Sequence, residues 1–257
     1  NCVSDGEIDP VEVRRGTGAI VLGMPHGGTH VPRGIFARLN AEGRILRDAD
    51  WRIETLYDGL LDDATIVRAN FHRYVIDANR DPSGVSLYPG QNTTGLVPLT
   101  NFDGEEIWEE EPDAQETTRR RVAYHEVYHA ALSAEIERVR AAHGVCVLYD
   151  CHSIRSVIPH LFDGALPDLN IGTNGGATCA PQIEAAALRI AEKSGFSFVL
   201  NGRFKGGWTT RHYGKPREGV HAIQMELAQS LYLQSEKPPF AYDASRVEEL
   251  RPVLKEI

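Results

Sequence analysis

Short apolar runs rich in β-branched residues alternate along this chain with longer segments of helical period. We expect strands at Ala19 to Met24, Thr65 to Ala69, Arg73 to Ala78, Val145 to Asp150, Ser197 to Leu200 and Val220 to Leu227. We expect helices at Arg44 to Leu61, Pro112 to His143, Pro181 to Ser194 and Ala244 to Glu256. This alternation is typical of α/β proteins. The sequence therefore predicts a central mixed, mostly parallel sheet with helices on both faces.

No linker divides the chain, so we expect residues 1–257 to form a single domain. Two stretches rich in Gly, Asn and Thr, Asp81 to Asp103 and Asn170 to Ala180, interrupt the alternation. Long ordered loops inside a compact domain are usually functional or act as lids. We therefore expect both stretches to be loops near a site.

The overall charge narrows the class of partner. A formal net charge of −9 argues against nucleic acid or an anionic membrane, which are bound through excess Lys and Arg. No run approaches the roughly 20 apolar residues needed to span a bilayer, and the polar N-terminus does not resemble a signal peptide. The four cysteines are far apart and form no CxxC pair: Cys2, Cys146, Cys151 and Cys179. We expect reduced thiols, a cytoplasmic protein and a small-molecule partner.

Two histidines stand at the carboxyl ends of predicted strands. His26 precedes a Gly-Gly pair, and His152 follows Asp150 after the apolar run that starts at Val145. Ligands bind at the carboxyl ends of strands in open α/β sheets. A histidine in a turn bonded to a loop carbonyl is the alternative for each, but two such positions support one another as a site.

Two acids are predicted to face inward. Asp50 lies on the apolar stripe of the helix expected from Arg44 to Leu61, whereas Asp48 is predicted to face solvent. A buried carboxylate is costly unless a cation or strong donors receive it, so either a metal or an Arg is expected beside Asp50. Glu226 shares a strand face with Gln224, and it is either a desolvated base of raised pKa or half of an internal ion pair.

Several cationic residues are candidates for binding carboxylates. Asn79 and Arg80 end the predicted strand at Arg73 to Ala78, and an Arg fork binds a carboxylate in bidentate fashion. Pairing of Arg80 with Asp77 or Asp81 is the alternative. Arg203 and Arg211 belong to a Gly-rich basic stretch, which suggests a pocket for an anionic ligand or else a solvated loop.

The helical segment contains HEVYH, which matches the HExxH motif of zinc proteases through His125, Glu126 and His129. No third ligand follows at the spacing that such proteases use. The two histidines also share a stripe with apolar residues, so they can instead line the interface between the helix and the sheet. We keep a zincin-type protease as an alternative function.

Seven ordered blocks between residues 19 and 233 resemble the N-formylglutamate amidohydrolase family, and residues 1–18 lie outside this resemblance. The blocks are PHGGTHVP, DADWRIETLYD, RYVIDANRDP, YDCHSI, NIGTNGGATC, NGRFKGGWTTRHYGKP and VHAIQMELAQSLYL. The family is similar in fold to the zinc carboxypeptidases. The resemblance implies His26 and His152 as zinc ligands and Glu226 as the base.

The resemblance also implies that Asn79 and Arg80 bind the substrate carboxylate. The HxxE pair of the carboxypeptidases is absent after His26, so we expect Asp50 to be the missing ligand, with His30 as a substitute. His129 matches a family Tyr-His pair, and together with Asp150 it is expected to support the ligands from outside.

The resulting hypothesis is a zinc hydrolase that converts N-formylglutamate to formate and glutamate in histidine degradation. His26, Asp50 and His152 would bind the metal, Glu226 would act as the base, and Arg203 or Arg211 would assist Arg80 and Asn79. Another divalent cation or a larger acyl group also fits the sequence. A relative that binds acidic amino acids without hydrolysing them is a further alternative.

Overall fold

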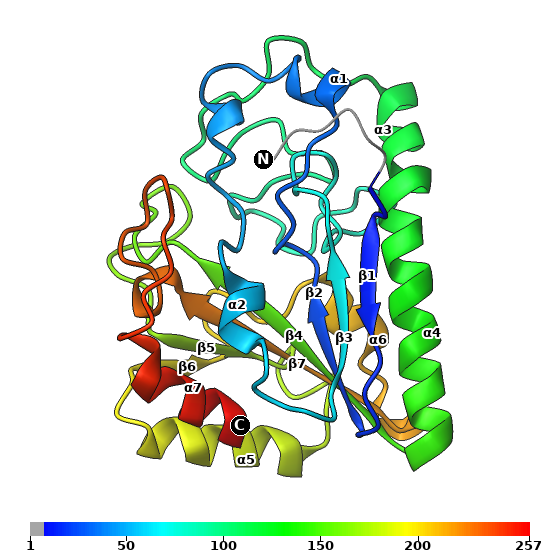
Figure 1. Ribbon diagram of the computed structural model, residues 1–257, viewed down its shortest axis with the longest axis vertical. Coiled ribbons are helices and arrows are strands. Elements are labelled where there is room, and N and C mark those ends of the chain that lie inside the picture. The colour runs from blue at the N-terminus through cyan, green and yellow to red at the C-terminus, as the bar shows by residue number, and fades with distance from the viewer. Residues whose placement is uncertain (1–7) are drawn as a thin grey trace.

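The computed structural model describes residues 8–257, so Cys2 and most of the polar N-terminal stretch lie outside the described range. Within it, one mixed sheet has the strand order β1-β3-β2-β4-β7-β5-β6 (Figure 1). The strands are β1 (Val11–Arg14), β2 (Ile20–Met24), β3 (Thr65–Ala69), β4 (Cys146–Ile154), β5 (Leu169–Gly172), β6 (Phe198–Leu200) and β7 (Val220–Ala228). Only the β1–β3 and β5–β7 pairs are antiparallel. The predicted mixed, mostly parallel sheet is confirmed.

Helices cover both faces of this sheet, as predicted. They are α1 (Arg33–Phe36), α2 (Ile53–Tyr57), α3 (Ala114–Arg120), α4 (Glu126–His143), α5 (Pro181–Lys193), α6 (Trp208–Tyr213) and α7 (Val247–Glu256). A π-helical turn, Arg121–His125, joins α3 to α4, and 3-10 turns occur at Gly43–Ile45, Pro216–Glu218 and Gln229–Leu231. The helices predicted from Pro112, Pro181 and Ala244 are therefore confirmed with small shifts at their ends.

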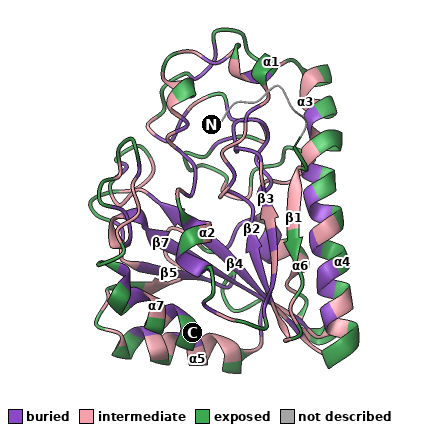
Figure 2. Ribbon diagram, in the orientation of Figure 1, coloured by how far each residue is buried: buried purple, intermediate pink, exposed green. Residues whose placement is uncertain are grey.

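Alternating strand residues build two separate cores. Val21 and Leu148 face α4, whereas Leu22 and Tyr149 face the layer formed by α2, α5 and α7. Residues that alternate along a strand point to opposite faces, so a strand covered on both sides is apolar throughout. Figure 2 accordingly shows the central strands buried along their length, while α4 exposes the side that faces away from the sheet.

Two predicted elements are wrong. The helix expected from Arg44 to Leu61 is broken because Leu46 and Arg52 adopt left-handed backbone conformations, with φ of 54° and 64°. These conformations cannot continue a right-handed helix, so only α2 and one 3-10 turn remain. The strand expected from Arg73 to Ala78 is a buried series of turns in which Asp77 N–H donates to Leu96 O at 2.8 Å. Its apolar side chains are nevertheless buried, in the core that also contains strand and α4 residues.

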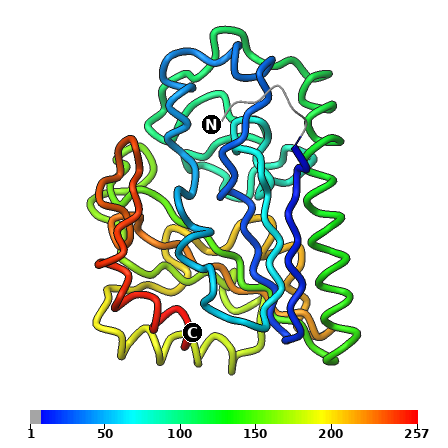
Figure 3. The backbone as a smooth tube through the Cα atoms, viewed as in Figure 1, coloured from blue at the N-terminus to red at the C-terminus, as the bar shows by residue number. Residues whose placement is uncertain are grey.

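The sequence also missed several short elements. β1, β5, α1 and α6 lie in stretches without a clear period, and β5 begins the stretch that was expected to be a loop from Asn170. Residues 81–103 do form a loop, as predicted. The segments before β3 and after it run side by side beyond the sheet (Figure 3), where Asn40 N–H donates to Ile107 O at 3.0 Å. This loop layer places further polar side chains beside the strand ends.

Two further observations bear on the sequence predictions. Cys146, Cys151 and Cys179 are buried free thiols. Within residues 8–257, none of the helices combines the length and the apolar character that a membrane span requires.

Candidate metal and active site

The sheet brings three of the predicted residues together. His26 directly follows β2, and β4 and β7 are parallel neighbours in which His152 is paired with Glu226 and Asp150 with Gln224. Because paired residues of parallel strands point to the same face, His152 and Glu226 enter one site. β4 extends to Ile154, so His152 lies within the strand and not after it as the sequence suggested.

A buried cluster suited to a metal ion is formed by His26, Asp50 and His152. One ligand atom from each lies within 4.8 Å of the others. Asp50 Oδ2 is 3.3 Å from His152 Nδ1 and 3.9 Å from His26 Nδ1. Nδ1 of His26 is buried without a hydrogen-bond partner, so it is available to coordinate a cation. His30, the substitute ligand, is not part of this cluster.

Both imidazoles are held from behind by carboxylates. Asp77 Oδ1 accepts a hydrogen bond from His26 Nε2 at 2.6 Å, and Asp150 Oδ2 accepts one from His152 Nε2 at 3.0 Å. With the protons on Nε2, each Nδ1 presents its lone pair toward Asp50. Metal-binding histidines in proteins are typically oriented in this way. Asp150 thus lies where the sequence predicted a supporting acid, whereas Asp77 had been considered only as a partner of Arg80.

The electrostatics of the cluster favour positive charge at its centre. Burial alone would raise the pKa of Asp50, but His152, His26 and Arg73 hold that pKa below its ordinary value. Burial alone would lower the pKa of His152, but Asp150 and Asp50 raise it well above its ordinary value. The same field that stabilises a proton on His152 would stabilise a metal cation at the cluster.

The balance of formal charges supports a divalent ion. Four buried acids face two arginines: Asp50, Asp77, Asp150 and Glu226 with Arg73 and Arg80. With the four acids ionised and both histidines neutral, as metal binding requires, these groups carry two excess negative charges. Buried charges are tolerated only when they are compensated, and a doubly charged cation would provide that compensation.

Glu226 adjoins the cluster and lines the same cavity as His26 and His152. Its side chain accepts a hydrogen bond from Gln224 Nε2 at 3.0 Å, and Gln224 Oε1 in turn accepts one from Gly207 N–H at 2.7 Å. Burial raises the pKa of Glu226 to about 7, although the nearby His152 partly opposes this. A carboxyl group with such a pKa can exchange protons at neutral pH.

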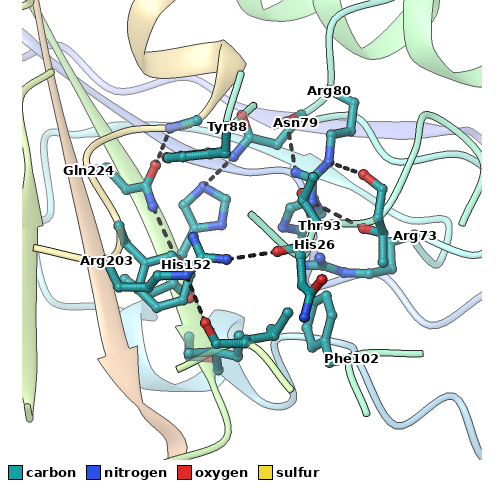
Figure 4. A pocket seen from close by; sticks show the side chains of 18 residues that line it. His26, Arg73, Asn79, Arg80, Tyr88, Thr93, Phe102, His152, Arg203 and Gln224 are labelled. Atoms are coloured by element: carbon teal, nitrogen blue, oxygen red, sulfur yellow. Dashed lines mark hydrogen bonds between the residues drawn. The ribbon is translucent and has the colours of Figure 1, made fainter. Parts of the chain in front are cut away.

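Asn79, Arg80 and Arg203 also line the cavity, and Figure 4 shows Arg203 on the same side as Gln224 and Arg80 on the other side. Arg80 donates from Nε to Thr94 O, from Nη2 to Thr94 Oγ1 and from Nη1 to Asn79 O. Nη1 also lies 3.6 Å from Asp77 Oδ2, so Arg80 pairs with a neighbouring acid, which was the alternative that the sequence offered. A guanidinium has five N–H groups, and one N–H on Nη2 remains for a ligand. Asn79 Nδ2 lies 3.3 Å from His152 Nε2, so Asn79 is next to the cluster.

Arg203 and Arg211 both pack over the Tyr88 ring, with guanidinium carbons 5.5 Å and 5.0 Å from its centroid. Arg203 lines the cavity, as expected for a residue that binds an anion. Arg211 does not line it, and its side chain donates to Gly206 O and Leu87 O. A role of Arg211 in binding the substrate therefore stays a prediction.

The HEVYH segment does not form a metal site. His129 Nε2 donates to Ala78 O at 2.7 Å, and its Nδ1 is 3.0 Å from the hydroxyl of Tyr213. His125 Nε2 donates to Arg80 O at 3.0 Å, while the Glu126 side chain is 48% exposed and pairs with Arg121. The protease alternative is wrong because the imidazole nitrogens support the backbone around Asn79. His129 thus acts on the site through this backbone.

Sequence reasoning missed one cation and misplaced one acid. Arg73 is buried against Asp50 and Asp77, and it lines the cavity. Arg73 could have been identified from the sequence, because a buried Asp50 was expected to need a positively charged partner. Asp48, predicted to face solvent, is buried and accepts hydrogen bonds from Tyr74 Oη at 2.8 Å and Phe102 N–H at 2.9 Å. Burial raises its pKa to about 6. The prediction failed because Asp48 belongs to a turn and not to a helix.

Comparisons with known proteins agree on one family. The family model described as N-formylglutamate amidohydrolase matches residues 18–233. The chain is 45% identical over 248 residues to the N-formylglutamate deformylase of Pseudomonas aeruginosa, and this alignment covers 95% of this chain and 92% of that protein. It is 44% identical over 242 residues to the N-formylglutamate deformylase of Pseudomonas putida, and this alignment covers 93% of this chain and 90% of that protein. The crystal structure of N-formylglutamate amidohydrolase from Ralstonia eutropha has the same fold, with a TM-score of 0.80 at 24% identity over 97% of this chain and 96% of the other.

Proposed function

The chain belongs to the N-formylglutamate amidohydrolase family, and we propose from this premise that it hydrolyses N-formyl-L-glutamate to formate and L-glutamate. The family match covers all seven sequence blocks on which the resemblance rested, which confirms that resemblance. One structural observation carries the proposal: a single cavity joins the metal-binding cluster and Glu226 to Asn79, Arg80 and Arg203. It combines groups that can hydrolyse an amide with groups that can bind carboxylates.

Zinc is the cation that we propose for the cluster, with His26, Asp50 and His152 as its ligands. Two imidazoles and one carboxylate with an open fourth position are a common ligand set of catalytic zinc. Bound zinc supplies a Lewis acid and makes hydroxide available near neutral pH. Because these ligands suit other divalent ions as well, elemental analysis of the purified protein is the direct test of zinc.

Glu226 is proposed as the base. It would take a proton from the water that attacks the formyl carbon and deliver it to the amide nitrogen as the carbon–nitrogen bond breaks. A pKa of about 7 suits both steps, since the group can accept and release the proton near neutral pH. The departing amine is then glutamate, and the carbonyl group leaves as formate.

Two arginines that line the cavity would bind the two carboxylates of the substrate. Arg80 is proposed for one of them, because it lines the cavity and keeps an N–H on Nη2 for a charge-assisted hydrogen bond. Asn79 would add a donor beside it. Arg203 also lines the cavity and keeps the donors of Nη1, so we assign the second carboxylate to it.

The family resemblance further supports a role at the end of histidine degradation. The buried free thiols of Cys146, Cys151 and Cys179 are consistent with our proposal of a cytoplasmic enzyme, because such thiols persist in a reducing compartment.

Formate release tests the proposal directly. Zinc-loaded protein is expected to release one formate for each glutamate from N-formyl-L-glutamate. If the pocket accepts only a formyl group, the release of acetate from N-acetyl-L-glutamate should be much slower. His152→Ala is expected to abolish both zinc binding and turnover. Binding of N-formyl-L-glutamate by zinc-loaded protein without turnover would instead identify a silent binding protein.

A further inference from the structure

Arg73 occupies an unusual place behind the metal-binding cluster. Its side chain is only 6% exposed, and Nη2 lies 3.2 Å from Asp50 Oδ1 while Nη1 lies 3.5 Å from Asp77 Oδ2. The guanidinium also packs over the ring of Phe102, with Cζ 4.8 Å from its centroid. The two ends of one guanidinium fork therefore contact two different acids.

Each of these acids uses its other oxygen for a histidine. Asp50 Oδ2 faces Nδ1 of His26 and His152 and also accepts a hydrogen bond from Ser153 N–H at 3.2 Å. Asp77 Oδ1 holds His26 Nε2 at 2.6 Å. Both carboxylates are thus divided between Arg73 on one side and the imidazoles on the other. Such a division fixes the rotation of each carboxylate about its own axis.

Arg73 is poorly placed to bind substrate, although it lines the cavity. Both of its Nη atoms are already directed at buried carboxylates. A third carboxylate at the same guanidinium would bring three negative charges together with one positive charge, which is costly in a buried site. Arg203, by contrast, donates to the neutral carbonyl oxygens of Leu161 and Asn92 and so keeps its charge for a ligand. Arg80 contacts one buried acid, with Nη1 3.6 Å from Asp77 Oδ2, and its other bonds go to neutral oxygens.

We propose that Arg73 is a positioning residue that makes Asp50 a one-oxygen ligand and, through Asp77, keeps Nδ1 of His26 directed at the cation. This inference rests on the metal centre of the proposed function. The planar fork is essential to it, because two acids at different angles require two Nη atoms in a fixed geometry. A Lys at this position would keep the charge, but its single ammonium cannot reproduce the fork.

Arg73→Lys tests the geometry without changing the charge. We expect it to raise the dissociation constant for zinc by about 10- to 100-fold, the range typical of lost partners behind metal ligands. The measurement is competition for zinc against a chromogenic chelator, with the unfolding midpoint of the metal-free protein recorded in parallel. A loss of zinc affinity that exceeds any loss of stability is the signature of positioning.

Arg155→Lys is the matched control. Arg155 is also largely buried, at 12% exposed, and its two Nη atoms bind the two oxygens of Asp103, but it does not touch the cluster ligands. Its Lys variant is expected to bind zinc as tightly as the wild type. Equal zinc affinity in Arg73→Lys and the wild type would overturn the role of Arg73 and leave the proposed function intact. A wild-type protein that binds no zinc would overturn both.

Discussion

Glu226→Gln separates the chemical role of this residue from the cost of burying it. The substitution keeps the shape of the side chain, and the amide oxygen can still accept the hydrogen bond from Gln224 Nε2. It removes the ability to take up a proton. We expect kcat for formate release to fall by at least about 100-fold, the lower range of general-base contributions, while zinc content stays close to that of the wild type.

The same substitution is expected to stabilise the metal-free protein at high pH. Burial raises the pKa of Glu226 from 4.5 to about 7. The folded state therefore holds this proton more tightly than the unfolded state. Below the unfolded-state pKa of 4.5 Glu226 is protonated in both states and costs no stability, and the cost grows as the pH rises from there through the folded-state pKa of about 7. At 1.36 kcal/mol per pKa unit, the full cost above the higher value is about 3 kcal/mol. Gln cannot ionise and does not carry this cost.

Urea unfolding of chelator-treated protein measures this effect. The free energy of unfolding of Glu226→Gln relative to the wild type should increase between about pH 5 and about pH 8. Glu249→Gln is the control for the exchange of Glu by Gln, because Glu249 is exposed on α7 and is not among the residues that line the cavity. A stability difference for Glu226→Gln that does not change with pH would refute the desolvation of Glu226. Full activity of the variant would remove the base from the mechanism.

Three further outcomes follow from the geometry of the cavity. Arg80→Ala should raise KM for N-formyl-L-glutamate by about 10- to 100-fold, since a hydrogen bond to a charged group contributes about 1.5–3 kcal/mol; an unchanged KM in steady-state kinetics would exclude the clamp. Gly207→Ala should lower kcat/KM, because a Cβ there would lie 2.3 Å from Asn79 Nδ2, whereas Gly34→Ala meets nothing within 4 Å and should have no such effect. Removing the metal with a chelator should abolish formate release and lower the melting temperature, and zinc at about 100 times its dissociation constant should restore about 2.7 kcal/mol of stability; a melting temperature insensitive to zinc would argue against binding to the folded state.

The strand-borne part of the site could be predicted from the sequence. Apolar runs marked β2, β4 and β7, and polar residues at their carboxyl ends identified His26, His152 and Glu226. Parallel strands place these ends at one edge of a sheet whatever the exact register. The prediction therefore needed only the direction of the strands, which the alternation with helices provides.

The loop-borne part could be predicted only partly. Asp50 was expected to face inward on a helix, and it is buried for another reason: it lies between two left-handed residues, and its N–H donates to His26 O at 3.0 Å. Left-handed conformations of Leu46 and Arg52 leave no sequence signal, since residues other than Gly rarely adopt them. Arg73 and Asp77 were hidden for a similar reason, because a buried apolar loop has the same composition as a buried strand.

The wrong strand and the apparent protease motif have a common physical explanation. The backbone from Asp77 to Arg80 lacks strand pairing, and yet its polar groups are bonded to side chains: Asn79 N–H donates to Asp77 Oδ1 at 2.8 Å, and the two histidines of HEVYH bond the carbonyls of Ala78 and Arg80. A buried loop is stable only if its backbone groups find such partners. The imidazoles therefore supply from α4 and the turn before it the bonds that a neighbouring strand would otherwise supply. These hydrogen bonds hold the backbone of Asn79 and Arg80 in place, as strand pairing would, and the proposed substrate clamp requires such fixed positions.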